Sequence, residues 1–408
     1  MFFNTKSLDE ALDIVRGRFH PLEEAELVPT GEARGRVLAA PIRSPLDLPG
    51  FPRATMDGYA VRARDTFGAS EGDPRKLRLA GEVRIGQPPD IYPSLAPGEA
   101  RAIPTGGALP PGADAVVPVE DTELLDPETV LVFSPVAPGT NVMAPDEDLQ
   151  AGQKLFEKGH RLRPQDLGAL LGVGITQVSV MRRVRVGIIS TGEELVPPEE
   201  EPGPGRIRDI NSYTLKAQLE EAGAVPKLYG IVPDEADALL AKTRAALVEN
   251  DVVLLSGGSS VGTRDLTMAV LAELGEVLVH GLRIKPGKPT ILGSSDGKAI
   301  VGLPGNPVSA MVACEALVIP LLQRLLGERE RPRRPIVRAE MAKHVPSAKG
   351  RLDFVRVKLV SGDGCLLAEP ILAQSGAISS LAEADGLVTI PAESEGLEQG
   401  ERVMVELW

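Results

Sequence analysis

The stretch from 251 to 307 constrains the fold most, because it places three glycine- or proline-rich turns close together in a strand-rich segment. Residues 252–255 form a short apolar run, as expected for a buried parallel strand. The turn Ser-Gly-Gly-Ser-Ser-Val-Gly follows at 256–262, and a helical pattern comes next. Backbone N–H groups and the helix dipole favour an anion at such a junction. The stretch therefore predicts a site for a phosphate or another oxyanion.

Two further turns favour the same interpretation. The run Lys-Pro-Gly-Lys-Pro places the ammonium groups of Lys285 and Lys288 on a loop stiffened by prolines. The run Gly-Leu-Pro-Gly-Asn-Pro at 302–307 opens another helix, with Asn306 suited to the N-cap and Pro307 to the first helical position. Any one turn could merely connect two elements. Three together, with two lysines, favour an oxyanion site.

Composition excludes several classes of protein. A formal net charge of −13 argues against general nucleic-acid binding, although it leaves room for a local basic pocket. Cys314 and Cys365 lie far apart and the four histidines are scattered, so we expect neither a disulfide framework nor a permanent zinc site. We find no signal-peptide pattern and no run of about 18 apolar residues, so we expect a cytoplasmic protein that does not enter a membrane.

The chain of 408 residues divides into four predicted domains. Residues 1–50 with 140–182 are expected to form a discontinuous helical N-terminal domain. A β module with short strands is inserted at 51–139. Residues 183–327 alternate strands and helices, which predicts a parallel sheet with helices on both faces. Residues 328–408 predict a β-barrel-like domain. The predicted fold class is therefore multidomain α/β.

Three segments carry the prediction of a helical first domain. Ser7 and Glu10 fit a capping box at the start of a helix that runs to Arg18. A second helical piece is expected at 35–38, and a third helix near 164–171. We therefore expect helices to dominate this domain.

Five short motifs occur in order along nearly the whole chain. They are Met-Asp-Gly-Tyr-Ala at 56–60, Ser-Thr-Gly at 190–192, Ser-Gly-Gly at 256–258, Lys-Pro-Gly-Lys-Pro at 285–289 and Gly-Leu-Pro-Gly-Asn-Pro at 302–307. Together they resemble the MoeA family of molybdopterin molybdenumtransferases, which is related to the E domain of gephyrin. The set is specific, whereas Ser-Gly-Gly alone is not.

The resemblance implies both a reaction and an assembly. In the implied reaction, adenylated molybdopterin and molybdate are the substrates, Mg²⁺ is the cofactor, and molybdenum cofactor and AMP are the products. The implied assembly is an elongated homodimer, in which the active site lies between the sheet domain of one subunit and the β module of the other. Molybdopterin adenylyltransferase and molybdoenzyme-maturation proteins are candidate partners.

The oxyanion site is expected to use cations and hydrogen-bond donors, because molybdate is a tetrahedral dianion. Lys285 and Lys288 supply point charges. Arg351 resembles the family's molybdate-contacting arginine, and a guanidinium can bond two oxyanion oxygens at once; the alternative for it is a surface ion pair. Ser375 matches the family serine best, but Ser379 lies close enough in sequence to leave the register open.

Cleaving the adenylate requires neutralised phosphate charge and a positioned nucleophile. Asp265, beside the phosphate-type turn, is the first candidate for metal binding and hydrolysis, and Glu194 is the second, because Mg²⁺ prefers carboxylates and water. Asp234 either binds substrate or caps the helix that follows it. The turn itself supplies Ser256, Gly257 and Gly258 as substrate-binding candidates.

The first half of the chain adds three candidates through the resemblance. The family pattern places aspartates that match Asp57 and Asp148 at the active site, with Asp57 reaching across the dimer. Thr105, in Pro-Thr-Gly-Gly, is a similar candidate. Without the resemblance, Asp57 is interpreted as a turn residue. Asp146 occupies a position where the family commonly has glycine, which is one of several mild departures.

Three functions are compatible with these residues. The first is the metal-inserting transferase. The second is adenylyl transfer from ATP to molybdopterin, for which the sheet domain alone would suffice, although the flanking modules favour insertion. The third is a non-catalytic scaffold. A scaffold would tolerate loss of Lys285, Lys288, Asp265 and Arg351, so their presence argues against it.

Overall fold

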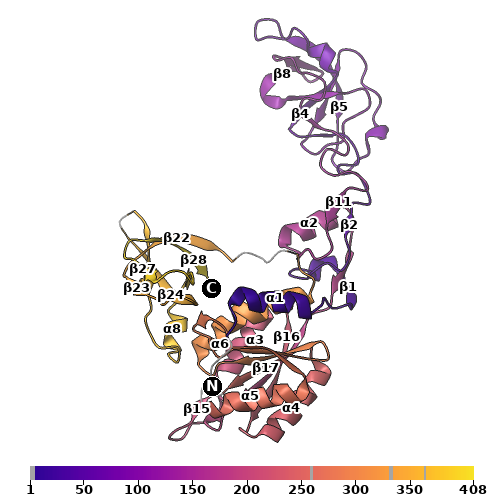
Figure 1. The fold of residues 1–408 in the computed structure, drawn as a ribbon. Helices are drawn as coiled ribbons and strands as arrows, with labels where there is room; N and C mark the ends of the chain where they lie inside the picture. The colour runs from indigo at the N-terminus through magenta and orange to yellow at the C-terminus, as the bar shows by residue number, and fades with distance from the viewer. Residues whose placement is uncertain (1–4, 258–260, 330–333, 363) are drawn as a thin grey trace.

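The computed structural model describes residues 5–257, 261–329, 334–362 and 364–408, without the side chains at 261–265. The chain is elongated (Figure 1). A β module lies at one end, a strand-rich connecting part follows, and the sheet domain and a C-terminal barrel lie side by side at the other end. This layout agrees with the predicted order of the parts, and the exact domain boundaries stay predictions.

The connecting part is built largely from strands, so the prediction of a helical N-terminal domain is wrong. Two antiparallel strand pairs form it, and one helix, α2, packs on them. The pairs are β1 (Ala25–Pro29) with β12 (Gln177–Met181) and β2 (Ile42–Arg43) with β11 (Lys154–Phe156). The predicted helix near 164–171 is α2 (Pro164–Gly172). Residues 35–38 are not helical, because Val37 and Leu38 form isolated β-bridges.

The first helix packs on a different domain from the one we expected. Helix α1 (Leu8–Arg18) begins at the predicted capping box, with the Ser7 side chain accepting from the Glu10 N–H and Glu10 accepting from the Ser7 N–H. Its buried residues Ala11 and Val15 join the core of the sheet domain. Because the apolar face of α1 is occupied there, the connecting part keeps only α2 and closes its own core with strands.

The β module is a six-stranded sheet in the order β7-β4-β6-β5-β9-β8. Its strands are β4 (Gly58–Val61), β5 (Arg75–Glu82), β6 (Glu99–Ile103), β7 (Ala115–Pro118), β8 (Thr122–Asp126) and β9 (Thr129–Val132). Gly58 pairs with both neighbours of β4, and a Cβ there would lie 2.0 Å from the Val117 carbonyl oxygen. Glycine is therefore required directly after Asp57.

The sheet domain has the strand order β16-β13-β17-β21-β20-β18. The strands are β13 (Arg185–Thr191), β16 (Val225–Val232), β17 (Val252–Gly257), β18 (Glu276–His280), β20 (Ile291–Ser295) and β21 (Lys298–Leu303). The first four strands in the order are parallel, as predicted. Strands β20 and β18 join through antiparallel pairs. Strand β20 is reversed against β21 because the two-residue turn Asp296–Gly297, with φ of 48° and 78°, joins them as a hairpin.

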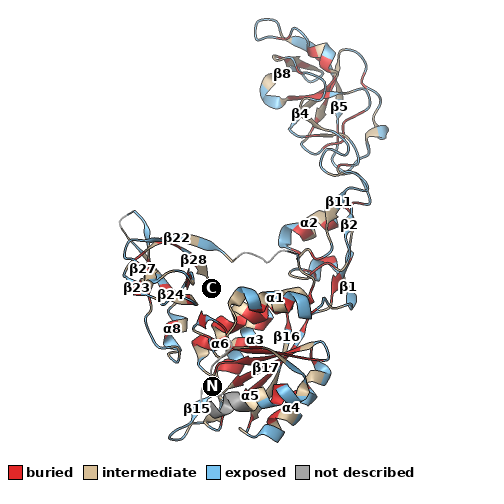
Figure 2. Cartoon of the chain, viewed as in Figure 1, coloured by how far each residue is buried: buried red, intermediate tan, exposed pale blue. Residues whose placement is uncertain are grey.

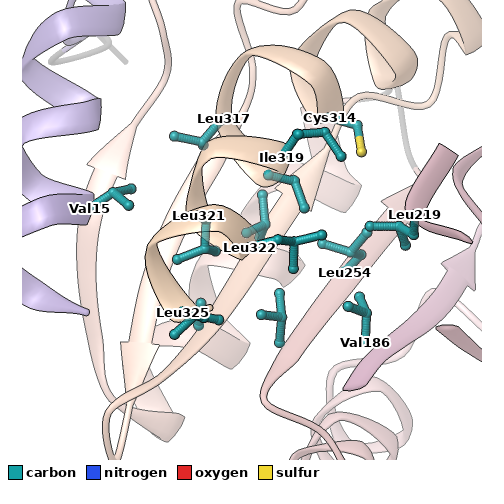
Figure 3. Close-up of a cluster of buried hydrophobic side chains, with 14 of the residues drawn as sticks. Val15, Val186, Leu219, Leu254, Cys314, Leu317, Ile319, Leu321, Leu322 and Leu325 are labelled. Carbon is teal, nitrogen blue, oxygen red and sulfur yellow. The ribbon is translucent and has the colours of Figure 1, made fainter. Parts of the chain in front are cut away.

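Helices cover both faces of this sheet, as predicted (Figure 2). One face carries α1, α3 (Asn211–Glu221), α6 (Pro307–Ala313), the π-helical turn η5 (Cys314–Val318) and α7 (Ile319–Leu325). The other face carries α4 (Ala236–Glu249) and α5 (Val261–Leu274). Figure 3 shows the first face, where Leu321 and Leu322 of α7 lie among Val186 and Leu254 of the sheet and Val15 of α1.

The composite helix Pro307–Leu326 is long and apolar enough to cross a membrane by length and composition alone. Its side chains instead form the core of the sheet domain, and 72% of its most apolar window is buried inside the protein. Burial against the sheet accounts for its apolar character.

The C-terminal domain is a closed five-stranded barrel, as the β-barrel-like prediction expected. The strands are β22 (Ile336–Met341), β24 (Leu352–Ser361), β25 (Leu366–Pro370), β26 (Gly386–Ile390) and β28 (Arg402–Leu407). Pairing of β24 with β26 closes the barrel. The short strand β19 (Ile284–Lys285) of the sheet domain pairs in parallel with β24, which connects the two domains.

Replacing the fully buried Leu254 with alanine should lower the free energy of unfolding by about 2–5 kcal/mol, because it leaves a cavity between the sheet and α7. Urea denaturation measures the change. The same substitution at Leu27, whose side chain is 64% exposed, should change stability by only about 0.5 kcal/mol. Equal losses at the two positions would contradict the packing described here.

Candidate functional site

A cavity of about 880 Å³ lies between the loops of the sheet domain and the barrel. Four segments contribute most of its lining: residues 282–289, 302–306, 348–356 and 371–375. Two of these are turns that the sequence singled out, and the other two belong to the barrel domain. The cavity thus brings together predicted candidates as far apart in sequence as Gly257 and Ser375.

The lysine loop is held in one conformation by its own backbone. Gly287 has φ of 115°, and a Cβ there would lie 2.8 Å from Cδ1 of Ile284. The Thr290 hydroxyl donates to the Gly287 carbonyl at 2.6 Å, and the Leu282 N–H donates to the Lys288 carbonyl at 2.9 Å. Lys285 and Lys288 both line the cavity with exposed side chains. The predicted pair of cations therefore lies at one site.

Arg351 also lines the cavity, and its partner is Asp353 on β24. Its Nε donates to Oδ1 of Asp353 at 2.8 Å, and its Nη2 donates to Oδ2 at 3.3 Å. The Asp353 side chain is 4% exposed, and Arg351 is 37% exposed. The ion pair that we weighed as an alternative for Arg351 is therefore present, but it lies in the cavity lining and not on an open surface.

The sequence left open whether Ser375 or Ser379 matches the serine of the family, and the positions of the two residues differ. Ser375 lines the cavity, and its hydroxyl accepts from Nδ2 of Asn306 at 3.1 Å. Its carbonyl accepts from the N–H of Val308 in the first turn of α6. Ser379 begins the short helix α8 (Ser379–Ala382) and does not line the cavity. The geometry favours Ser375, and its role stays a prediction.

Asn306 and Pro307 occupy the predicted positions at the start of α6, as N-cap and first helical residue. The Asn306 side chain, however, bonds across to Ser375 and makes no hydrogen bond that caps α6. The sheet domain and the barrel therefore share a second polar contact at the cavity.

The carboxyl ends of β13, β17 and β21 lie level in the sheet, because Ser190, Ser256 and Leu303 occupy one register. The Oγ of Ser256 is buried and has no hydrogen-bond partner among the residues that the structure describes. A Cβ at Gly257 would lie 1.9 Å from the Thr191 carbonyl oxygen, so glycine is required there. Gly257 lines the cavity, whereas Gly258 lies outside the described residues.

Acidic side chains gather at the same edge of the sheet. The Thr191 hydroxyl donates to Asp234 at 2.6 Å, and the buried Ser190 hydroxyl donates to Asp209 at 2.6 Å. Asp234 does not cap a helix, because α4 begins at Ala236 after the N-cap Glu235. Glu194 is half-buried at the end of the turn that follows β13.

A magnesium site at this edge fits the donors that the structure describes. Mg²⁺ uses one or two carboxylates together with substrate phosphates and water. Glu194 and Asp234 follow the carboxyl ends of β13 and β16, and the Ser256 hydroxyl lies at the end of β17 without a hydrogen-bond partner in the described part of the chain. The described residues contain no group of three His, Cys, Asp or Glu side chains placed to hold a metal alone. The side chain of Asp265, the first candidate, is outside the described part of the chain.

The three candidates from the first half lie far from the cavity within one chain. Asp57 and Thr105 belong to the β module at the opposite end of the molecule (Figure 1). The Thr105 N–H and hydroxyl both donate to Oδ1 of Asp57, at 2.6 and 2.9 Å. Asp148 is exposed at the boundary of the module, where its N–H donates to the Leu48 carbonyl. The structure thus joins Asp57 with Thr105 and separates both from the lysines.

Two residues of the cavity were missed by sequence reasoning. Asp353 follows Arg351 by two positions where β24 begins, and a period of two is the spacing of side chains on one face of a strand. Arg356 lines the cavity and is 8% exposed, and burial lowers the pKa of its guanidinium. It donates to the Ser380 hydroxyl and to the Ala373 carbonyl. The sequence pattern gave no signal for these contacts.

Known proteins share the succession of domains found in this chain. The chain matches the models of the MoeA N-terminal region (domains I and II) at 6–174, a probable molybdopterin binding domain at 187–324, and the MoeA C-terminal region (domain IV) at 338–408. The chain belongs to the MoeA family. The resemblance seen in its motifs is therefore confirmed.

Relatives of this family member cover nearly its full length. The molybdopterin molybdenumtransferases of Haemophilus influenzae and Bacillus subtilis are 33% and 34% identical to it, over 94% and 98% of this chain and 94% and 93% of theirs. The crystal structure of the molybdopterin biosynthesis MoeA protein from Pyrococcus horikoshii superposes with a TM-score of 0.87 at 34% identity. That match covers 99% of this chain and 100% of the other.

The Asp57 carboxyl should titrate at low pH, because the N–H of Thr105, and next its hydroxyl, hold the pKa of Asp57 below its usual range. Thr105→Val removes the hydroxyl and keeps the N–H, so the pKa of Asp57 should rise part of the way toward its usual range. NMR titration of ¹³C-labelled aspartate measures this change. Thr122→Val removes a hydroxyl bonded elsewhere in the module and should leave the pKa of Asp57 unchanged. An unaltered Asp57 pKa in Thr105→Val would contradict the contact.

Proposed function

We propose that this molybdopterin molybdenumtransferase takes adenylated molybdopterin and molybdate and yields molybdenum cofactor and AMP. One observation carries the proposal: Lys285, Lys288, Arg351 and Ser375 line a single cavity that reaches the carboxyl end of the parallel sheet. Two ammonium groups, a guanidinium and a hydroxyl suit a tetrahedral dianion. Ligands of open α/β sheets bind at that end of the strands, which places the organic substrate next to the oxyanion.

The adenylate is proposed to lie along the ends of β13, β16 and β17. Gly257 lets the chain pass close to Thr191, and Ser256 offers a hydroxyl that bonds to none of the described residues. Glu194 and Asp265 are the proposed ligands of Mg²⁺, which would neutralise phosphate charge when AMP leaves. Asp234 is oriented by the Thr191 hydroxyl toward this edge, so it contributes a fixed negative charge or a hydrogen-bond acceptor.

A homodimer completes the proposal. Asp57 and Thr105 lie far from the cavity of their own chain (Figure 1), so they can reach a lysine cavity only in a second copy. This separation supports a site shared between the sheet domain of one subunit and the β module of its partner, with Asp148 at the edge of that module. The proposal includes a cytoplasmic location, which agrees with burial of the apolar helix Pro307–Leu326.

The reaction can be tested by AMP release from adenylated molybdopterin, with and without molybdate and Mg²⁺. The wild-type protein should release AMP faster when molybdate is present. Asp265→Ala and Lys288→Ala should each lose about 100-fold or more of this rate, because the first removes a proposed ligand of Mg²⁺ and the second removes a cation of the oxyanion site. Lys242→Ala removes a lysine on α4 outside the cavity and should retain the wild-type rate.

Two results would overturn the proposed reaction. If folded wild-type protein releases no AMP, the transferase reaction is rejected and the result supports a non-catalytic scaffold. If the protein instead consumes ATP in the presence of free molybdopterin, adenylyl transfer is the correct reaction. Mass measurement of the pterin product separates these two cases.

The shared site predicts complementation between two inactive variants. Asp57→Ala lacks a group of the β module, and Lys288→Ala lacks a group of the sheet domain. After subunit exchange, half of the dimers contain one chain of each kind, and each such dimer regains one intact site of two. Activity should therefore return to about a quarter of the wild-type rate per dimer.

The matched control mixes Lys285→Ala with Lys288→Ala, which both affect the same domain and should not complement. If one variant carries an affinity tag and the other does not, recovery of the untagged chain with the tagged one establishes that exchange has taken place. Complementation that is absent after proven exchange would show that each chain builds its site alone.

A further inference from the structure

The carboxylate of Asp353 contacts cations from two domains. The parallel pairing of β19 with β24 places Lys285 beside Asp353 in register. The Lys285 Nζ lies 3.5 Å from Oδ2 of Asp353, and Arg351 binds the same carboxylate through Nε at 2.8 Å and Nη2 at 3.3 Å. Two of the cavity's cations are thus already partly neutralised within the protein.

Because this carboxylate is buried, its negative charge acts strongly on the neighbouring cations. Its side chain is 4% exposed, whereas Lys285 is 57% exposed. The Ser347 hydroxyl donates to Oδ2 at 2.9 Å, which fixes the carboxylate from the barrel side. Charges interact more strongly where water is excluded. The Asp353 carboxylate is therefore fixed in place away from water, whereas the side chains of the two cations remain accessible to a ligand in the cavity.

Arg351 can bind the Asp353 carboxylate and an anionic ligand at the same time. A guanidinium has five N–H donors, and Asp353 occupies two of them. The carboxylate orients the guanidinium plane, and the remaining donors are available to a ligand. A dianion that enters the cavity gains from these donors and from the lysines. It is also repelled by the negative charge of Asp353.

We propose that Asp353 is the internal counter-ion of the oxyanion site: it positions Arg351 and Lys285, and it limits the affinity of the site for a tetrahedral dianion. The inference rests on the proposed function in taking such a dianion as the ligand. A transferase must release its oxyanion to the reaction, and binding that is equally tight before and during the reaction would not raise the rate. Asp353 keeps the cations ordered in the free enzyme and weakens their hold on the bound oxyanion.

Asp353→Asn tests this inference, because it removes the charge and keeps the shape of the side chain. The measurement is calorimetric titration of the full-length protein with molybdate alone, in a buffer without phosphate or sulfate. The Kd for molybdate should fall about tenfold or more, since a unit charge at a few ångströms is worth at least that factor. The rate of AMP release should fall at the same time, because Arg351 loses its fixed orientation.

Three variants serve as controls. Asp385→Asn changes the net charge equally at an exposed position of the barrel outside the cavity and should leave the Kd unchanged. Ser347→Ala removes a hydrogen bond to Asp353 without changing charge and should alter the Kd by only about twofold. Asp353→Glu keeps the charge and should not tighten binding. Loss of structure cannot produce tighter binding, so a lower Kd separates this role from a merely structural one.

Weaker or unchanged molybdate binding by Asp353→Asn would overturn the inference. Asp353→Ser provides a second neutral variant in case the first does not fold, and failure of both to fold would identify Asp353 as a structural residue and also overturn it. Molybdate binding is measured without adenylated molybdopterin, so its outcome does not depend on the AMP-release assay. A wild-type protein that binds no molybdate would reject the counter-ion role, and AMP release would then decide the proposed reaction separately.

Discussion

The pairing of β19 with β24 is the contact on which the cavity depends. It continues the lysine loop of the sheet domain directly into the edge of the barrel, at Ile284 opposite Leu352 and Lys285 opposite Asp353. Since the pairing involves backbone groups, it fixes the loop with respect to the barrel whatever the side chains do. Other contacts, such as the hydrogen bond between Asn306 and Ser375, also join the two domains, but this pairing is the one that sets Lys285 beside Asp353. The charge cluster of the site therefore depends on one short interdomain strand pair.

Turns and helix caps could be predicted from the sequence where they depend on residues that are close together in the chain. The capping box of Ser7 and Glu10 occurs where it was expected, and it depends only on hydrogen bonds within a few residues. The lysine loop is likewise held by contacts among its own residues, so its candidates could be named before their common cavity was known. Asn306 occupies the expected N-cap position, but its side chain bonds to the distant Ser375.

Partners across the chain could not be predicted in the same way. The apolar face of α1 shows that the helix is half-buried, but its period does not say which domain covers it, and the sheet domain does. Asp234 was left open between a helix cap and a substrate ligand, and Thr191 on another strand binds its carboxylate. Both outcomes concern contacts between segments distant in sequence. The hairpin at Asp296 and Gly297, by contrast, is a local turn that reverses one strand of a sheet expected to be parallel.

The charge of the whole chain and the charge of the site have opposite signs, and the distance over which charge acts reconciles them. A net charge of −13 opposes the approach of a dianion, but salt at physiological strength screens exposed charges beyond about 8 Å. Within that range, the cavity lining presents Lys285, Lys288 and Arg351 against the buried Asp353. The affinity for an oxyanion is therefore decided by these few groups, and a single carboxylate among them carries more weight than the acidic surface elsewhere.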